Sequence, residues 1–99
     1  MNQYELRWPE HFEDDAWEIE SKGWFNGLEI NFEGRSLRPM FYDPIRLRQD
    51  IAEELSNSGF FRERALIVVK CITRQAIEQV VEELAVRGDL SYLFRQDFR

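Results

Sequence analysis

The sequence predicts an α+β fold in which an antiparallel three-stranded meander is followed by two strand–helix–strand units. The dipeptide Asn26-Gly27 is typical of a tight hairpin turn, and apolar residues alternate on both sides of it. Further along, the apolar run of residues 65–69 leads into a segment whose apolar residues have helical spacing. The expected order is therefore βββαβαβ, a mixed sheet with two helices.

The first fifteen residues mix aromatic and acidic side chains. Tyr4, Leu6 and Trp8 alternate with other residues, which predicts a short edge strand. Pro9 has no backbone N–H and interrupts any regular element, so residues 10–15 are expected to form a loop.

Residues 16–33 are expected to form the first hairpin of the meander. With Phe25 opposite Leu28, the predicted core face carries Trp17, Ile19, Ser21, Gly23, Phe25, Leu28, Ile30 and Phe32. The reverse face carries Glu18, Glu20, Lys22, Trp24, Glu29, Asn31 and Glu33. The reverse face is therefore expected to be wet, with one aromatic residue.

Residues 36–42 continue the meander after a turn at Gly34-Arg35. The ladder then places Phe32 opposite Leu37 on the core face. Pro39 cannot donate a ladder hydrogen bond, which makes this strand an edge or leaves it partly covered.

A helix follows the meander, with Asp43 as its N-cap and Pro44 as its first residue. Leu47, Ile51 and Leu55 form its expected buried stripe, and residues 57–59 end it. The strand–helix–strand arrangement implies parallel neighbouring strands joined by right-handed crossovers.

Residues 65–69 are assigned to the centre of the sheet, since five consecutive apolar residues suit burial on both faces. Thr73 is expected to cap the second helix and Gly88 to end it. Its apolar stripe consists of Ile77, Val80, Val81 and Leu84. Residues 90–94 are expected to form the last strand.

Two segments carry a resemblance. They are F-Y-D-P-I-R-L-R-Q-D-I-A-E-E-L at residues 41–55 and V-V-K-C-I-T-R-Q-A-I at residues 68–77. In them the chain resembles a group of small uncharacterised bacterial domains, with cyanobacteria as the suggested lineage. The resemblance covers residues 16–94 and carries no known active residues.

Length and composition indicate one domain spanning residues 1–99, because two halves would each fall near the lower limit for a self-supporting core. No apolar stretch approaches the roughly 20 residues that cross a bilayer, and the N-terminus lacks the plan of a signal peptide. A cytoplasmic location is expected. The single cysteine, Cys71, is interpreted as a small buried apolar residue in a reducing compartment.

The net charge of −6 is concentrated in the first part of the chain. Residues 1–43 carry ten acidic and four basic side chains, whereas residues 44–99 carry nine of each. Such a field disfavours nucleic acid and anionic membranes, and it favours a protein partner with a basic surface. Solubility alone is another reason for a charge of this size.

Few residues suggest catalysis or cofactor binding. His11 lies among Glu10, Glu13, Asp14 and Asp15, a composition that suits a divalent metal but equally suits a solvated acidic loop. No second histidine is available to activate a serine, and each glycine is isolated, so no phosphate-binding loop is expected. The sequence predicts no catalytic residues, no metal ligands and no cofactor.

Surface recognition remains. The predicted meander brings an apolar corner beside an acidic stripe, and the candidate protein-binding residues are Trp24, Glu29, Met40, Tyr42, Glu18 and Glu20. An alternative is that residues 1–15 fold back and cover this corner.

The leading hypothesis is a non-enzymatic binding protein, of adaptor, inhibitor or immunity type, that engages a basic protein as a monomer or weak homodimer. One alternative is a small metal-dependent enzyme or metal-binding domain that uses the His11 cluster. Another is a structural subunit of an oligomer.

Overall fold

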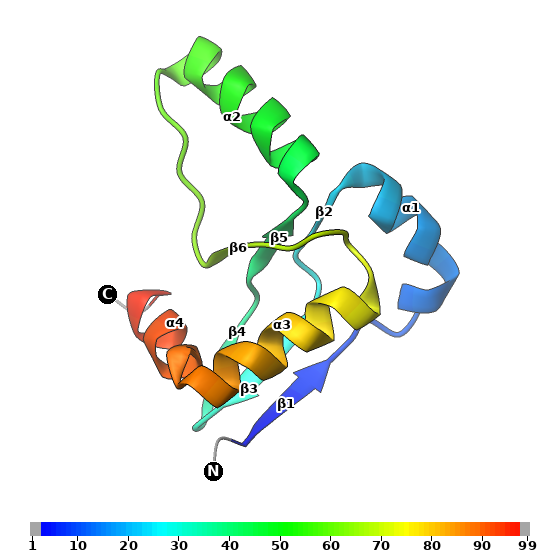
Figure 1. Cartoon of the computed structure of the whole chain (residues 1–99), viewed down its shortest axis with the longest axis vertical. Helices are drawn as coiled ribbons and strands as arrows, with labels where there is room; N and C mark the ends of the chain where they lie inside the picture. The colour runs from blue at the N-terminus through cyan, green and yellow to red at the C-terminus, as the bar shows by residue number, and fades with distance from the viewer. Residues whose placement is uncertain (1–2, 98–99) are drawn as a thin grey trace.

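The computed structural model describes residues 3–97, which form two three-stranded β-sheets and four α-helices (Figure 1). The α+β class is therefore confirmed. The elements follow in the order β1 (Tyr4–Arg7), η1 (Phe12–Asp15, a 3₁₀ helix), α1 (Ala16–Lys22), β2 (Trp24–Phe25), β3 (Glu29–Phe32), β4 (Arg35–Leu37), β5 (Met40–Tyr42), α2 (Pro44–Ser58), β6 (Leu66–Val68), α3 (Arg74–Arg87) and α4 (Asp89–Asp97).

The first sheet is antiparallel, with the strand order β1-β3-β4. The expected N-terminal edge strand is confirmed as β1. The hairpin between β3 and β4 turns at Glu33 and Gly34, whose φ angles of 51° and 79° are both positive, as in the tight turns that match strand twist. The predicted turn at Gly34-Arg35 was therefore one residue late. Ile30 and not Phe32 lies opposite Leu37, and this shift of two residues keeps both side chains on the buried face.

The hairpin predicted at Asn26-Gly27 does not form, because residues 16–22 are the helix α1. Ala16 and Ile19 pack against the core at a spacing of three, which a helix allows and a strand does not. Gly23 ends the helix with a φ of 83°. Gly27 does not have a positive φ; it is small because a Cβ there would lie 2.9 Å from the Phe25 ring.

The second sheet has the strand order β2-β5-β6. β2 and β5 are antiparallel, and β5 and β6 are parallel neighbours joined through α2, as the strand–helix–strand pattern predicted. The assignment of residues 65–69 to the centre of the sheet was wrong. β6 is an edge strand and Val68 is 47% exposed, because the segment expected to pair beyond it forms a helix instead.

That segment, residues 90–94, belongs to α4 and not to a final strand. Leu90 and Phe94 are both buried, and their spacing of four places them on one helical face. The Phe94 ring lies 5.5 Å from the Phe32 ring of the first sheet. α4 therefore closes the end of the core that α3 leaves open.

The second predicted helix is confirmed as α3, with both of its caps. The Thr73 hydroxyl accepts a hydrogen bond of 3.2 Å from the Ala76 N–H, and Gly88 has a φ of 80°. α3 buries Ile77, Val81 and Ala85 in a cluster that also contains inner-face residues of both sheets. The core therefore lies where the two sheets meet α3.

The first predicted helix is confirmed as α2, but its expected burial was wrong. Asp43 Oδ1 accepts a hydrogen bond of 2.8 Å from the Arg46 N–H, and Gly59 ends the helix with a φ of 85°. None of the residues of α2 is buried, and Leu55 is 51% exposed. Figure 1 shows α2 at one end of the molecule, away from α3, because the inner sheet faces are already occupied.

Two substitutions on α3 test where the core lies. Ile77→Ala should lower the free energy of unfolding by about 2–5 kcal/mol, because it leaves a cavity in the buried cluster. Val86→Ala on the same helix should change it by no more than about 0.5 kcal/mol, since Val86 is 70% exposed. Urea unfolding measures both, and equal costs would contradict this placement of the core.

The tyrosines give a pH-dependent test of tertiary contacts. The Tyr4 hydroxyl donates a hydrogen bond of 2.7 Å to Glu82 Oε1, and this bond, with burial and the Glu82 charge, raises the pKa of Tyr4 from 10.0 to about 12. As the pH rises through this window, the unfolded chain releases the Tyr4 proton while the folded chain retains it. The free energy of unfolding should therefore fall.

Tyr4→Phe removes this contribution. Urea unfolding at several pH values should give a shallower fall for the variant than for the natural chain between pH 10 and 12. Identical slopes would mean that the Tyr4–Glu82 hydrogen bond does not persist in solution.

Candidate protein-binding surface

The six residues expected to form one recognition site are distributed over different parts of the fold. Glu18 and Glu20 lie on α1, whereas Trp24 lies in β2. Glu29 lies in β3, in the other sheet, where it is opposite Arg7 and 3.8 Å from Arg38. The expected pairing of Glu29 with Trp24 is absent because the hairpin that required it does not form.

Met40 and Tyr42 share one face of the second sheet with Trp24, since Trp24 is directly opposite Tyr42. Tyr42 is nevertheless buried: its hydroxyl donates a hydrogen bond of 2.6 Å to Asp50, and its ring lies 6.5 Å from that of Phe61. Burial, followed by the hydrogen bond to Asp50, raises the pKa of Tyr42. Tyr42 thus contributes to packing and does not present a side chain to a partner.

Among the residues that the structure describes, the most exposed aromatic side chain lies on α1. Ala16 and Ile19 turn toward the core, which leaves Trp17 pointing outward with 73% of its surface exposed. Glu18 and Glu20 follow it on the same helix and are exposed too. The sequence had assigned Trp17 to the core because the strand interpretation gave it the same parity as Ile19.

A shallow groove of about 410 Å³ separates α1 from β2. Glu18, Lys22 and Trp24 line it, and Lys22 Nζ lies 4.4 Å from the centre of the Trp24 ring. This distance suits a cation–π contact. We call Trp17, Glu18, Glu20, Lys22 and Trp24 the α1 surface; it combines two tryptophans with acidic side chains.

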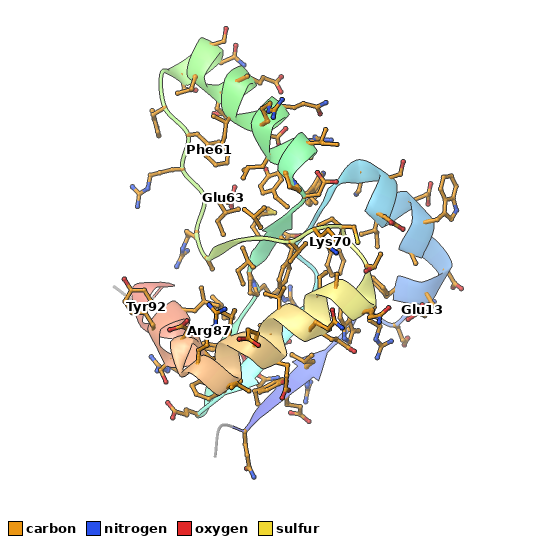
Figure 2. The ribbon with its side chains drawn as sticks, viewed as in Figure 1. Glu13, Phe61, Glu63, Lys70, Arg87 and Tyr92 are labelled. Atoms are coloured by element: carbon orange, nitrogen blue, oxygen red, sulfur yellow. The ribbon has the colours of Figure 1, made fainter. Side chains whose placement is uncertain are left out.

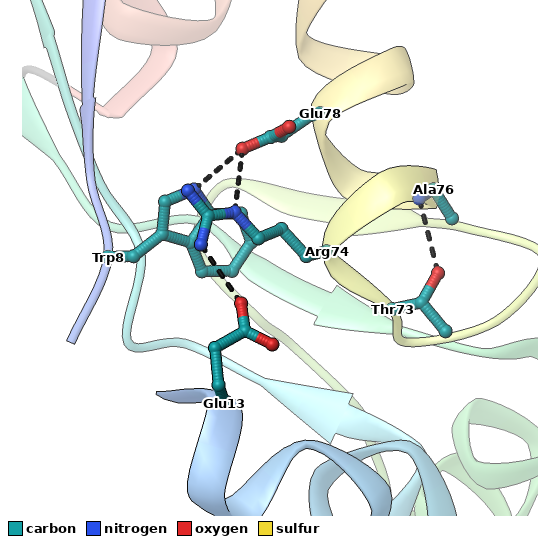
Figure 3. A network of polar contacts seen from close by, with 6 residues as sticks. All are labelled: Trp8, Glu13, Thr73, Arg74, Ala76 and Glu78. Atoms are coloured by element: carbon teal, nitrogen blue, oxygen red, sulfur yellow. Dashed lines mark hydrogen bonds and ion pairs between the residues drawn. The ribbon is translucent and has the colours of Figure 1, made fainter. Parts of the chain in front are cut away.

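A polar network holds Trp8 and Glu13, which precede α1 in the chain, against α3 (Figure 3). Trp8 Nε1 donates a hydrogen bond of 3.0 Å to Glu78 Oε2, which also accepts one of 3.1 Å from Arg74 Nε. Arg74 Nη1 lies 2.9 Å from Glu13 Oε2. The carboxylates of Glu78 and Glu13 raise the pKa of Arg74 through these hydrogen bonds, so its charge is retained.

Aromatic packing around Trp8 supports the same network. The Arg74 guanidinium lies 5.2 Å from the centre of the Trp8 ring. Trp8 contacts Phe12 at a ring distance of 4.6 Å, and Phe12 contacts Phe25 at 5.2 Å. Because Phe12 and Glu13 belong to η1, which runs directly into α1, these contacts fix the position of the α1 surface.

The residues considered for metal binding or thiol chemistry show ordinary contacts. His11 Nδ1 lies 3.5 Å from Asp14 Oδ2, and both side chains are highly exposed. Within residues 3–97 no group of three or more histidine, cysteine, aspartate or glutamate side chains could hold a metal ion. Cys71 was expected to be buried but is half-buried, and its Sγ lies 3.8 Å from Thr73 Oγ1.

Comparisons with protein-family models, with curated proteins and with solved structures each found no match to this chain. In the part of the chain that the structure describes, none of the helices has the length and apolar character needed to span a membrane.

Two identical substitutions test the anchoring network. Trp8→Phe removes the indole N–H that bonds Glu78, and it should lower the free energy of unfolding by about 1 kcal/mol. Trp17→Phe should leave it within about 0.5 kcal/mol, because that side chain points outward. Chemical unfolding of both variants gives the comparison; a larger cost at Trp17 would contradict its exposure.

Proposed function

We propose that this chain is a non-enzymatic protein-binding module, of adaptor, inhibitor or immunity type, that docks a basic protein on the α1 surface. The observation that carries the proposal is the outward position of Trp17 on a helix that also exposes Glu18 and Glu20. A large aromatic residue with low conformational freedom is the usual anchor of a protein interface. Leaving one exposed without a partner brings no benefit to the fold.

Charge supports a basic partner. Residues 10–22 carry six acidic side chains against one lysine, and the surrounding residues 1–43 account for the whole net charge of −6. An acidic field of this kind attracts a basic surface over a distance comparable to the Debye length, which is about 10 Å at 0.1 M salt. The field would speed the encounter, while Trp17 would slow the dissociation.

The groove between α1 and β2, which Trp17 does not line, adds a second contact. Trp24 is half-buried and its ring is covered on one side by Lys22. An arginine of the partner could displace Lys22 from this ring and bond Glu18, since guanidinium groups stack on aromatic rings and bind carboxylates. The α1 surface therefore offers one apolar anchor and one position suited to a cation.

Affinity capture with the purified chain tests the proposal. Captured proteins, identified by mass spectrometry, should be enriched in basic proteins and should be lost at high salt. Trp17→Ala should weaken binding to an identified partner about 30-fold, which corresponds to about 2 kcal/mol. Tyr92→Ala, which removes another exposed aromatic residue, is the matched control and should bind normally.

Charge reversal provides the second comparison. The double variant Glu18→Lys, Glu20→Lys should lose the partner, whereas Glu5→Lys, Glu33→Lys should retain it, although both change the net charge equally. Equal losses of partner binding in the two double variants would mean that net charge alone explains the binding. Capture of proteins that are not basic would overturn the electrostatic part of the proposal.

A further inference from the structure

The chain exposes more surface than a monomer of its size. Its accessible area is 6950 Å², whereas a monomeric protein of 12.0 kDa is expected to expose about 6,000 Å². The radius of gyration, 14.0 Å, also exceeds the value of about 12.6 Å expected for 99 residues. The excess of roughly 950 Å² is comparable to the approximately 800 Å² that each partner contributes to a standard interface.

Part of this excess accessible area is apolar surface on helix α2 and on the segment that follows it. α2 and α3 have 15 and 14 residues, yet α3 buries three of them and α2 none. Among the described residues, no apolar side chain of α2 belongs to the core cluster or packs against it. Leu55 and Phe60 are 51% and 60% exposed.

The outer face of the second sheet lies on the same side as α2. The register places Met40, Tyr42, Leu66 and Val68 on this face, with Trp24 of the α1 surface at its β2 edge. The Tyr42 side chain contacts Asp50 of α2 and also Phe61, which Figure 2 shows on the segment that leads from α2 to β6. Met40, Leu66 and Val68 are likewise outside the core cluster. We call Met40, Leu55, Phe60, Leu66 and Val68 the α2–β6 face.

We infer that two copies of this chain associate as a symmetric dimer through the α2–β6 face. Each copy has an amphipathic helix that contacts its own sheet at Tyr42 but buries none of its residues, and a sheet face on which Val68 stays exposed. A two-fold contact in which α2 of each copy packs on the outer face of the other satisfies both at once. This dimer contact uses only surface that the single chain already exposes.

Charge distinguishes this face from the α1 surface. Residues 44–68 carry four acidic and four basic side chains, so a second copy meets little like-charge repulsion there. Within α2, Arg46 is ion-paired with Asp50 at 2.9 Å, and the exposed Arg48 precedes the exposed pair Glu53 and Glu54. Antiparallel packing across a two-fold axis therefore brings the basic half of each helix toward the acidic half of the other.

Pairing through the open edge of β6 is a less favourable arrangement. An antiparallel pair centred on Ile67 would set Leu66 against Val68 of the second copy, but β6 has only three residues and Ala65, with a φ of 48°, ends the extended backbone before it. So short an edge strand offers few ladder hydrogen bonds to a second copy. We therefore assign the dimer contact to the α2–β6 face and not to the edge of β6.

Light scattering of the full chain after size exclusion tests the dimer. The natural chain should have twice the mass of 12.0 kDa and should keep it at high salt, which separates this contact from partner binding at the α1 surface. Val68→Asp and Leu55→Asp, on different elements, should each raise the dissociation constant at least about tenfold by burying a carboxylate. Val86→Asp, an exposed valine on α3, should remain dimeric.

Near-ultraviolet circular dichroism checks that each variant is folded. If Val68→Asp disturbs β6, Leu55→Asp decides, because its side chain lies on a helix that contributes nothing to the core cluster. A natural chain that stays monomeric at every concentration, or folded variants as dimeric as the natural chain, would overturn the inference. Loss of partner capture would leave it unaffected.

Discussion

The burial of α3 is the contact on which the rest of the structure depends. Ile77, Val81 and Ala85 belong to the same cluster as Phe25 and Phe41 of one sheet and Ile30 of the other. Neither three-stranded sheet is wide enough to hold a core by itself. Burying each of the larger side chains contributes about 1.5–3 kcal/mol, so α3 is what joins two small sheets into one fold.

This arrangement also decides which surfaces stay open. α3 and α4 occupy the inner side of the sheets, so α2 can only lie on the outer side, where Tyr42 and its hydrogen bond to Asp50 provide a limited contact. Its apolar residues therefore remain accessible although their spacing is that of a buried helix. At the other end of the chain, Arg74 and Glu78 of α3 hold Trp8 and Glu13, and so position α1 with its outward tryptophan.

The two open surfaces differ in chemistry. The α1 surface is acidic and aromatic, whereas the α2–β6 face is apolar with balanced charge. A dimer formed through the second would present two copies of the first. If a partner offered two basic sites at a matching distance, the second contact would become intramolecular and the overall affinity would rise without any new residue.

The sequence by itself determined those features that depend on neighbouring residues. Asp43 and Thr73 cap their helices because a side-chain oxygen meets an N–H three positions later. Gly59 and Gly88 end them because glycine tolerates a positive φ. The edge strand β1 and the parallel pair formed by β5 and β6 also follow from local spacing. For the candidate site, the acidic character and the residues Glu18, Glu20 and Trp24 were available from the sequence.

Only the tertiary structure decided what depends on distant partners. Residues 16–22 contain apolar pairs at spacings of two and three, and packing of Ile19 on the core selected the helix that exposes Trp17. Residues 90–94 became a helix because Phe94 reaches Phe32 across the core. That choice left β6 at an edge and α2 on an open face. Burial is a property of the assembled fold. A pattern of apolar residues therefore determines which face of an element is apolar, but not which other element packs on that face.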